Sequence, residues 1–382
     1  MTSSERVIYS ADAVYNGVGL PLAGAGVLVS SANTIVAFGK LEVLGAQFPD
    51  VTVQHLGQAI LPAPVNAHTH LDLSRVPFKA LPYYRWIPEH ILTNRALRGL
   101  EAARIGLDAL RASGVGAFGD IVFSAAVMEF LLSESDLPGV AHWEIFKPDP
   151  LDADAVHLET VKNLRDWRKL ERKVKTGLSL HAPFSVSSGL LTSLSQVARL
   201  EGLPLQIHVA EHPSELELFR TGAGPMAASL LRGGMPPFEA TIGRKPDPDL
   251  TPVKYLAELG VLDAKPTLIH MVGVTEEDVR IVAQFGCSVV TCPRSNRNLQ
   301  CGVFPWALYA KYGVEVGLGT DSVASGETLD IRDEVRAALE VHPALGLPTV
   351  LRWAVKGGYK ALGMKTPVVA RGDDFSSLTV WK

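Results

Sequence analysis

Apolar and polar positions follow each other along this chain in a pattern that predicts eight strand–helix units in series. Short runs rich in valine, isoleucine and leucine recur along it, and glycine, proline or polar residues bound each run. Such runs are typical of strands buried on both faces, as in a parallel sheet. We predict strands at residues 60–67, 115–122, 139–146, 176–183, 204–211, 266–272, 288–296 and 315–321.

The segments between these strands carry apolar residues at intervals of three and four, which is the spacing of an amphipathic helix. Helices are predicted at residues 91–112, 155–171, 190–201, 276–285 and 329–339. Eight such units in series favour a closed (β/α)8 TIM barrel of the α/β class. An open doubly wound sheet is the alternative, but no G-x-G-x-x-G turn follows the first strand.

The two ends of the chain predict a second, smaller unit. Short strand-like runs separated by Gly, Asn and Ser turns fill the first 60 residues without a long helical pattern, and residues 371–381 read as a turn and one strand. We therefore expect residues 1–59 and 366–382 to form a small discontinuous β-sandwich domain, with the barrel at 60–365. The segment 213–265 is longer than its neighbours and is a candidate lid or substrate wall.

Composition narrows the classes of partner. The 382 residues carry a formal net charge of −4, so no basic field is available for nucleic acid or an anionic membrane, and a small-molecule substrate is expected. Three cysteines without a paired motif fit a reducing compartment. The N-terminus lacks a secretory pattern, and no uncharged apolar stretch of about 18 residues occurs. We expect a cytoplasmic protein, and a homodimer is left open.

Ionisable residues collect at the predicted carboxyl ends of the strands, where barrel enzymes place their functional side chains. Five of the eight strand ends carry one or more of them: His68, His70, His181, His208, Glu211, His270 and Asp321. A histidine satisfied within the core accounts for one or two of these positions. It does not account for polar groups that interrupt apolar runs repeatedly at the same end, so the pattern predicts a metal site.

Three imidazoles and one carboxylate, from His68, His70, His208 and Asp321, suit one Zn²⁺ or Fe²⁺ ion and leave room for water. Such an ion lowers the pKa of its bound water to about 7, which makes a hydroxide nucleophile available.

The remaining strand-end groups have catalytic roles in this hypothesis. Glu211 would relay the proton of the water to the substrate, His270 would orient the hydroxide, and Asp321 would accept its proton. The alternatives are a surface carboxylate for Glu211, a packed histidine for His270, and a metal-stabilised binding scaffold without turnover for the whole chain.

Two short motifs compete with this interpretation. His208-Val-Ala-Glu-His212 matches the H-x-x-E-H pattern of zinc proteases, which needs both histidines on one helix. Pro204 and Pro213 bracket a strand-like segment there, so His212 is expected in a loop. His142-Trp-Glu144 matches the H-x-E of small zinc deaminases, but the P-C-x-x-C that they require is missing.

Over nearly its full length the chain resembles the amidohydrolase superfamily, in the branch that holds cytosine, guanine, S-adenosylhomocysteine and aminofutalosine deaminases and the triazine hydrolases. The motifs are Pro64-Val-Asn-Ala-His-Thr-His-Leu71, His181-Ala-Pro-Phe-Ser-Val-Ser187, His208-Val-Ala-Glu211, Leu268-Ile-His270, Thr291-Cys-Pro-Arg-Ser-Asn296 and Gly317-Leu-Gly-Thr-Asp-Ser322. Ala63 replaces the usual glycine before the first motif. The resemblance implies a hydrolase of non-peptide C–N bonds with the ligand and proton-transfer roles given above.

The resemblance also bears on the metal count and on substrate contacts. Strand four ends in His181 and lacks the lysine of binuclear members, which implies a single ion. The matching histidine of adenosine-type deaminases contacts substrate, so His181 is assigned to binding, with a structural strand-end histidine as the alternative.

Residues 70–74 and 83–87 look most like the aminofutalosine deaminases of menaquinone biosynthesis. This likeness implies attack of metal-bound hydroxide on C6 of 6-aminofutalosine and release of ammonia. It makes Asp72, Ser74 and Arg75 candidate substrate contacts. The benzoate of that substrate calls for a cation, and Arg294 is a candidate together with Arg75, Arg85 and Arg297. An adenosine-type or other nucleobase deaminase and a triazine or cyclic-amide hydrolase are the alternatives.

Overall fold

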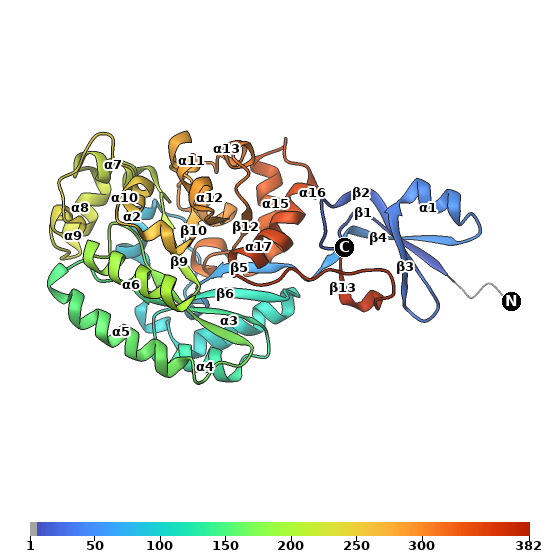
Figure 1. Ribbon diagram of the computed structural model, residues 1–382, viewed down its shortest axis with the longest axis horizontal. Coiled ribbons are helices and arrows are strands. Elements are labelled where there is room, and N and C mark those ends of the chain that lie inside the picture. The colour runs from blue at the N-terminus through green and yellow to red at the C-terminus, as the bar shows by residue number, and fades with distance from the viewer. Residues whose placement is uncertain (1–5) are drawn as a thin grey trace.

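The computed structural model describes residues 6–382 and shows a barrel with a smaller sheet at one side (Figure 1). Eight parallel strands line up in sequence order from β12 to β5, and a parallel bridge between Thr69 and Asp321 joins the first strand to the last. The barrel strands are β5 (Val65–Thr69), β6 (Ala117–Val122), β7 (Gly139–Ile145), β8 (Val174–Leu180), β9 (Leu205–Val209), β10 (Thr267–His270), β11 (Ser288–Thr291) and β12 (Val316–Leu318). The predicted (β/α)8 class is confirmed.

Helices surround the barrel sheet (Figure 1). The longer ones are α3 (Leu100–Ser113), α4 (Ala125–Glu134), α5 (Ala153–Trp167), α6 (Ser188–Glu201), α7 (Pro213–Thr221), α8 (Gly224–Arg232), α11 (Glu276–Phe285) and α15 (Ile331–Val341). The shorter ones are α2 (Tyr83–Trp86), α9 (Phe238–Ile242), α10 (Pro252–Glu258), α12 (Pro293–Asn298), α13 (Trp306–Lys311), α14 (Val323–Gly326), α16 (Leu347–Arg352) and α17 (Gly358–Ala361). One hydrophobic core of buried aliphatic and aromatic side chains joins the strands to these helices.

The long segment after β9 is helical. It forms α7, α8, α9 and α10 in succession, and α8 approaches the segment after β5, where the Ser229 hydroxyl donates a hydrogen bond of 2.6 Å to the carbonyl of Tyr84. The two longest excursions from the barrel therefore support each other at its carboxyl-terminal end. A lid function for this segment stays a prediction.

Both ends of the chain meet in a five-stranded mixed sheet, in the order β13-β4-β1-β2-β3 (Figure 1). Its strands are β1 (Val7–Val14), β2 (Leu22–Val29), β3 (Ile35–Lys40), β4 (Thr52–Pro62) and β13 (Leu378–Trp381). The carboxyl-terminal strand pairs antiparallel with β4, as the predicted return of the chain requires. Within residues 6–382 the unit is one sheet with a helix on it rather than two packed sheets. The domain limits at 59/60 and 365/366 stay a prediction, and β4 crosses the first of them.

Three local details differ from the sequence prediction. The small unit contains a helix, α1 (Leu41–Gln47), which was missed because it has only two turns; Leu44 packs there against Ile8 and Leu28. The predicted helix at 91–112 begins only at Leu100, since Gly99 has a φ of +110° that no helix adopts. The apolar run 60–67 is divided at residues 63–64 between β4 and β5.

Within residues 6–382, no helix combines the length and the apolar character needed to cross a membrane.

Candidate metal centre and active site

Three histidines converge at the carboxyl end of the barrel. His68 lies on β5, His70 follows the same strand by one residue, and His208 lies on β9. Their ligand atoms all lie within 4.8 Å of one another, and His68 and His208 are almost completely buried. Side chains two residues apart on a strand point to the same side, so the H-x-H pair and the distant His208 can share one ion.

Asp321 completes this cluster and lies three residues after the end of β12. Its Oδ1 lies 3.4 Å from Nε2 of His70 and 3.9 Å from Nε2 of His68. Its Oδ2 accepts hydrogen bonds from the hydroxyls of Ser295 (2.6 Å) and Ser325 (3.0 Å). One carboxylate oxygen is thus held by the protein while the other faces the histidines.

Hydrogen bonds fix which nitrogen of His68 and of His208 is left for a metal. The Nδ1–H of His68 donates to the amide oxygen of Gln206 (3.1 Å), and the Nδ1–H of His208 donates to the carbonyl of His181 (2.9 Å). Nε2 of both rings is therefore left with a lone pair. In the described part of the chain, Nε2 of His68 is buried without any hydrogen-bond partner, which a bound metal would supply.

Burial and the mutual repulsion of the imidazoles lower the pKa of His68, and burial is the main cause of the lowered pKa of His70 and of His208. Neutral imidazoles are the form that binds metal. Three neutral imidazoles and one carboxylate fit a divalent ion such as Zn²⁺ or Fe²⁺. The donor set predicted from the sequence is therefore brought together in one place.

A buried carboxylate fixes the backbone on both sides of His70. Oδ1 of Asp120, on β6, accepts hydrogen bonds from the hydroxyl of Thr69 (2.9 Å) and from the backbone N–H of Leu71 (2.8 Å). Because both neighbours of His70 are tied to the same oxygen, its ring is held toward the cluster. The sequence prediction did not include Asp120, although it follows the rule that polar groups interrupt apolar strands near their ends.

Glu211 and His270 lie beside the cluster and beside each other. Oε1 of Glu211 lies 3.7 Å from Nε2 of His270 and 3.9 Å from Sγ of Cys301. Glu211 and His270 are almost fully buried. Nδ1–H of His270 donates to the amide oxygen of Asn296 (2.9 Å), which turns Nε2 toward Glu211. Burial, and then the negative charge of Asp321, raise the pKa of Glu211 well above its usual value.

Strained backbone accompanies these residues. Ala210, His270 and Asp321 have φ values of +50°, +68° and +57°, in the left-handed region that side chains other than glycine rarely adopt. Each such residue costs about 1–3 kcal/mol and persists where the surroundings impose it. All three lie in or directly between the predicted site residues, so the strand ends turn sharply to aim them inward.

His181 also joins the cluster. Its ring lies 5.2 Å from that of His208, and its Nδ1 forms a hydrogen bond of 2.6 Å with the hydroxyl of Ser185. Burial lowers the pKa of His181 to about 3, so that it is neutral. Its position beside the ligands is compatible with the predicted binding of substrate.

The candidates that follow β5 are only partly near the site. Asp72 is buried and forms an ion pair of 2.7 Å with Arg98. Ser74 lies against Gly106 of α3, and Arg75 is exposed. The structure therefore brings Asp72 to the edge of the cluster and does not bring Ser74 or Arg75 into it.

The structure gives Arg294 a structural position, contrary to the role predicted for it. Its Nε donates to Oε1 of Glu334 (2.6 Å), and its other two nitrogens donate to the hydroxyl and the carbonyl of Thr328 (both 2.9 Å). All three nitrogens are engaged and the side chain is buried, which is typical of a structural ion pair rather than of a substrate contact. Its motif position could not reveal this because a long side chain can turn to either side of a helix.

Arg294→Met should therefore destabilise the fold and leave substrate affinity unchanged. Removing one partner of a buried ion pair leaves the other charge uncompensated, which costs about 3–5 kcal/mol. Urea unfolding should report this loss of free energy, while KM of the folded fraction stays within about twofold of the native value. A large rise in KM with unchanged stability would restore the predicted role in substrate binding.

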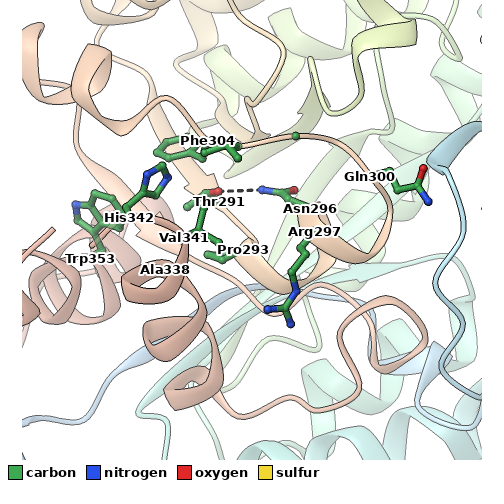
Figure 2. A pocket seen from close by; sticks show the side chains of 12 residues that line it. Thr291, Pro293, Asn296, Arg297, Gln300, Phe304, Ala338, Val341, His342 and Trp353 are labelled. Carbon is green, nitrogen blue, oxygen red and sulfur yellow. Dashed lines mark hydrogen bonds between the residues drawn. The ribbon is translucent and has the colours of Figure 1, made fainter. Parts of the chain in front are cut away.

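An apolar cavity of about 290 Å³ lies next to Asn296, the residue that accepts the hydrogen bond from His270. Figure 2 shows Asn296 at its edge with a hydrogen bond to Thr291, and Phe304, His342 and Trp353 across from them. Asn296 thus separates this cavity from the candidate active site.

The sequence prediction missed Glu144, which lies near the carboxyl end of β7. A carboxylate oxygen of Glu144 lies within 4.8 Å of the ligand nitrogens of His181 and His208. Burial raises the pKa of Glu144 to about 8, and the positive charge of Arg98 opposes that rise. The same strand-end rule that identified the histidines would have found it, but the motif His142-Trp-Glu144 was considered only as part of a different fold.

Comparison with known proteins agrees with this geometry. The model of the Amidohydrolase family matches residues 59–381. An aminodeoxyfutalosine deaminase of Deinococcus radiodurans is 49% identical over 377 residues, covering 98% of this chain and 90% of that protein. The crystal structure of Helicobacter pylori aminofutalosine deaminase with methylthio-coformycin superposes with a TM-score of 0.73 at 23% identity, over 96% of this chain and 90% of the other. A zinc-bound adenosine deaminase of Xanthomonas campestris gives a TM-score of 0.69 at 23% identity, over 96% and 83% of the two chains.

Proposed function

The chain belongs to the amidohydrolase family, and from this premise we propose that it removes the 6-amino group of 6-aminofutalosine, also written aminodeoxyfutalosine, by hydrolysis. The observation that carries the chemistry is the contact of Glu211 and His270 at the edge of the histidine–aspartate cluster. The relative from Deinococcus radiodurans, at 49% identity over most of both chains, supports the choice of substrate. The reaction would belong to menaquinone biosynthesis.

We propose that His68, His70, His208 and Asp321 hold one divalent ion, zinc or iron. When bound, such an ion lowers the pKa of a water molecule so that a hydroxide nucleophile is available near neutral pH. A structural site needs neither a proton-transfer acid nor a second histidine beside it, and both Glu211 and His270 are present here. The cluster therefore suits catalysis.

The residues of the chain then divide the proton transfers. His270, fixed by Asn296, presents Nε2 toward Glu211 and orients the attacking oxygen. Asp321, whose other oxygen is held by two serines, accepts the proton of the attacking water through Oδ1. Glu211, whose raised pKa favours the protonated form, donates to N1 of the purine ring.

The atoms balance as a hydrolysis. One C–O bond forms at C6 and gives a tetrahedral carbon, and the bond from C6 to the exocyclic nitrogen then breaks. Glu211 gives its proton to N1 and regains one from the water, and the second proton of the water passes through Asp321 to the departing nitrogen. Ammonia and the 6-oxo purine are therefore the products. The buried positions of both carboxyl groups keep bulk water away from these transfers.

A screen for released ammonia tests the proposal. The full chain, loaded with zinc or iron, should release ammonia from 6-aminofutalosine with a higher kcat/KM than from adenosine, methylthioadenosine or S-adenosylhomocysteine. Chloride release from a chlorotriazine and ring opening of a cyclic amide serve as comparisons for other hydrolases. Absence of ammonia from every adenine nucleoside, with one metal bound per chain, would refute the proposal. The metal's identity, a cytoplasmic location and a homodimer remain predictions.

A further inference from the structure

Glu144 is a carboxyl group in the candidate site whose buried Oε1 lacks a partner within residues 6–382. It lies on the same face of β7 as His142 and reaches to within 4.8 Å of the ligand nitrogens of His181 and His208. Among residues 6–382, no group forms a hydrogen bond with its buried Oε1. The mechanism proposed above gives it no task.

None of the three charged residues that influence Glu144 electrostatically is available as its ion-pair partner. Arg98 lies close enough to influence it electrostatically, but its Nε and one terminal nitrogen are engaged by Oδ2 of Asp72 at 2.8 and 2.7 Å. Asp72 and Asp321 are the other charged groups near Glu144, and both are negative. A buried polar group without a partner costs about 1–3 kcal/mol, so a ligand that supplies a hydrogen-bond donor would relieve that cost.

We propose that Glu144 accepts hydrogen bonds from the sugar hydroxyls of the nucleoside substrate and so selects ribonucleosides. This inference rests on the proposed function. Sugar hydroxyls both donate and accept hydrogen bonds, so they can pair with the Glu144 carboxyl group in either protonation state. Glu144 is then a specificity-determining residue on the wall formed by β7, next to His181.

The chemistry of the substrate excludes its other parts as partners of Glu144. The ring nitrogens of the purine only accept hydrogen bonds, so they could pair with Glu144 only through its acidic proton and would leave its other oxygen without a donor. The 6-amino group must lie at Glu211 for reaction. A substrate carboxylate would be repelled by Glu144 and by Asp72, since Arg98 is already paired. Only the sugar hydroxyls combine hydrogen-bond donors with neutrality.

The test compares sugars on the native enzyme and on two variants, using the full metal-loaded chain. The measurement is kcat/KM for ammonia release from the ribonucleoside and from its 2′-deoxy and 3′-deoxy analogues. The native enzyme should prefer the ribonucleoside by about tenfold to a hundredfold, as expected when a deoxy analogue leaves a buried carboxyl group without its hydrogen-bond partner. Glu144→Leu, which removes both oxygens, should reduce that preference to about twofold or less.

Glu144→Gln is the matched control because it keeps the shape and one acceptor oxygen, and it should retain an intermediate preference. Metal content and thermal unfolding of both variants show whether the site is intact. If the native enzyme releases no ammonia from any ribonucleoside, the proposed function fails. If it is active but shows no preference for the ribose, or if Glu144→Leu keeps the full preference, the role of Glu144 is overturned.

Discussion

Glu211→Gln should reduce kcat for ammonia release by about 10²- to 10⁴-fold while the protein still binds its metal. The amide keeps the size of the side chain but cannot carry the proton from the attacking water to the purine ring. Glu211 lies 3.7 Å from His270 and is not one of the four proposed ligands, so its replacement leaves the donor set complete. Metal analysis and steady-state kinetics on the same preparation measure both effects.

Glu217→Gln is the matched control for this variant. Glu217 lies on α7, six residues further along the chain, and is exposed. Its replacement removes the same charge without touching the cluster, so kcat should stay within about twofold of the native value. Full turnover by the Glu211→Gln protein would exclude its role in proton transfer, and loss of metal from it would place the residue among the ligands instead.

The location of the site could be predicted because a parallel barrel brings the carboxyl ends of its strands together. His68 and Asp321 are far apart in the sequence, yet their strands β5 and β12 close the barrel beside each other through the bridge from Thr69 to Asp321. The identification of strand ends was therefore enough to predict which ionisable groups meet. Apolar runs identify such strands well, since these are buried on both faces.

The direction of a side chain beyond a strand end could not be predicted in the same way. Arg294 and Ser74 both lie in or near a motif at a strand end. The side chain of Arg294 is turned toward Glu334, and that of Ser74 is turned toward α3. The helical turns and the positive φ angles that set these directions depend on packing of distant segments. The hydrogen bonds that Gln206, Asn296 and Asp120 accept likewise join elements whose contacts the sequence alone does not give in atomic detail.

Glu144 shows a different limit. Its strand was predicted and its position near the strand end could have been noticed, but the motif that it forms with His142 was considered only as part of a different fold. Only the structure reveals that its carboxyl group faces His181 and His208 and that its buried oxygen lacks a partner. A missing hydrogen-bond partner can be recognised only when the positions of all neighbouring groups are known.

His68→Ala should abolish both metal binding and activity, whereas His212→Ala should preserve both. The pair distinguishes the ligand set at the strand ends from the H-x-x-E-H alternative, in which His208 and His212 would bind metal from one helix. His208 lies on strand β9, and His212 is the N-cap of α7, with Nδ1 accepting a hydrogen bond of 3.0 Å from the backbone N–H of Ser214. A strand and a cap do not present two imidazoles on one helical face.

The two variants should also differ in stability and in their response to added metal. Loss of the cap in His212→Ala costs about 1 kcal/mol, with metal content unchanged. His68→Ala removes a fully buried ring whose Nε2 has no other partner among residues 6–382, so added zinc or iron should not restore its activity. The native chain stripped by a chelator should regain activity on the same addition, because its donor set is intact. Metal retained by His68→Ala, or lost from His212→Ala, would overturn the ligand assignment.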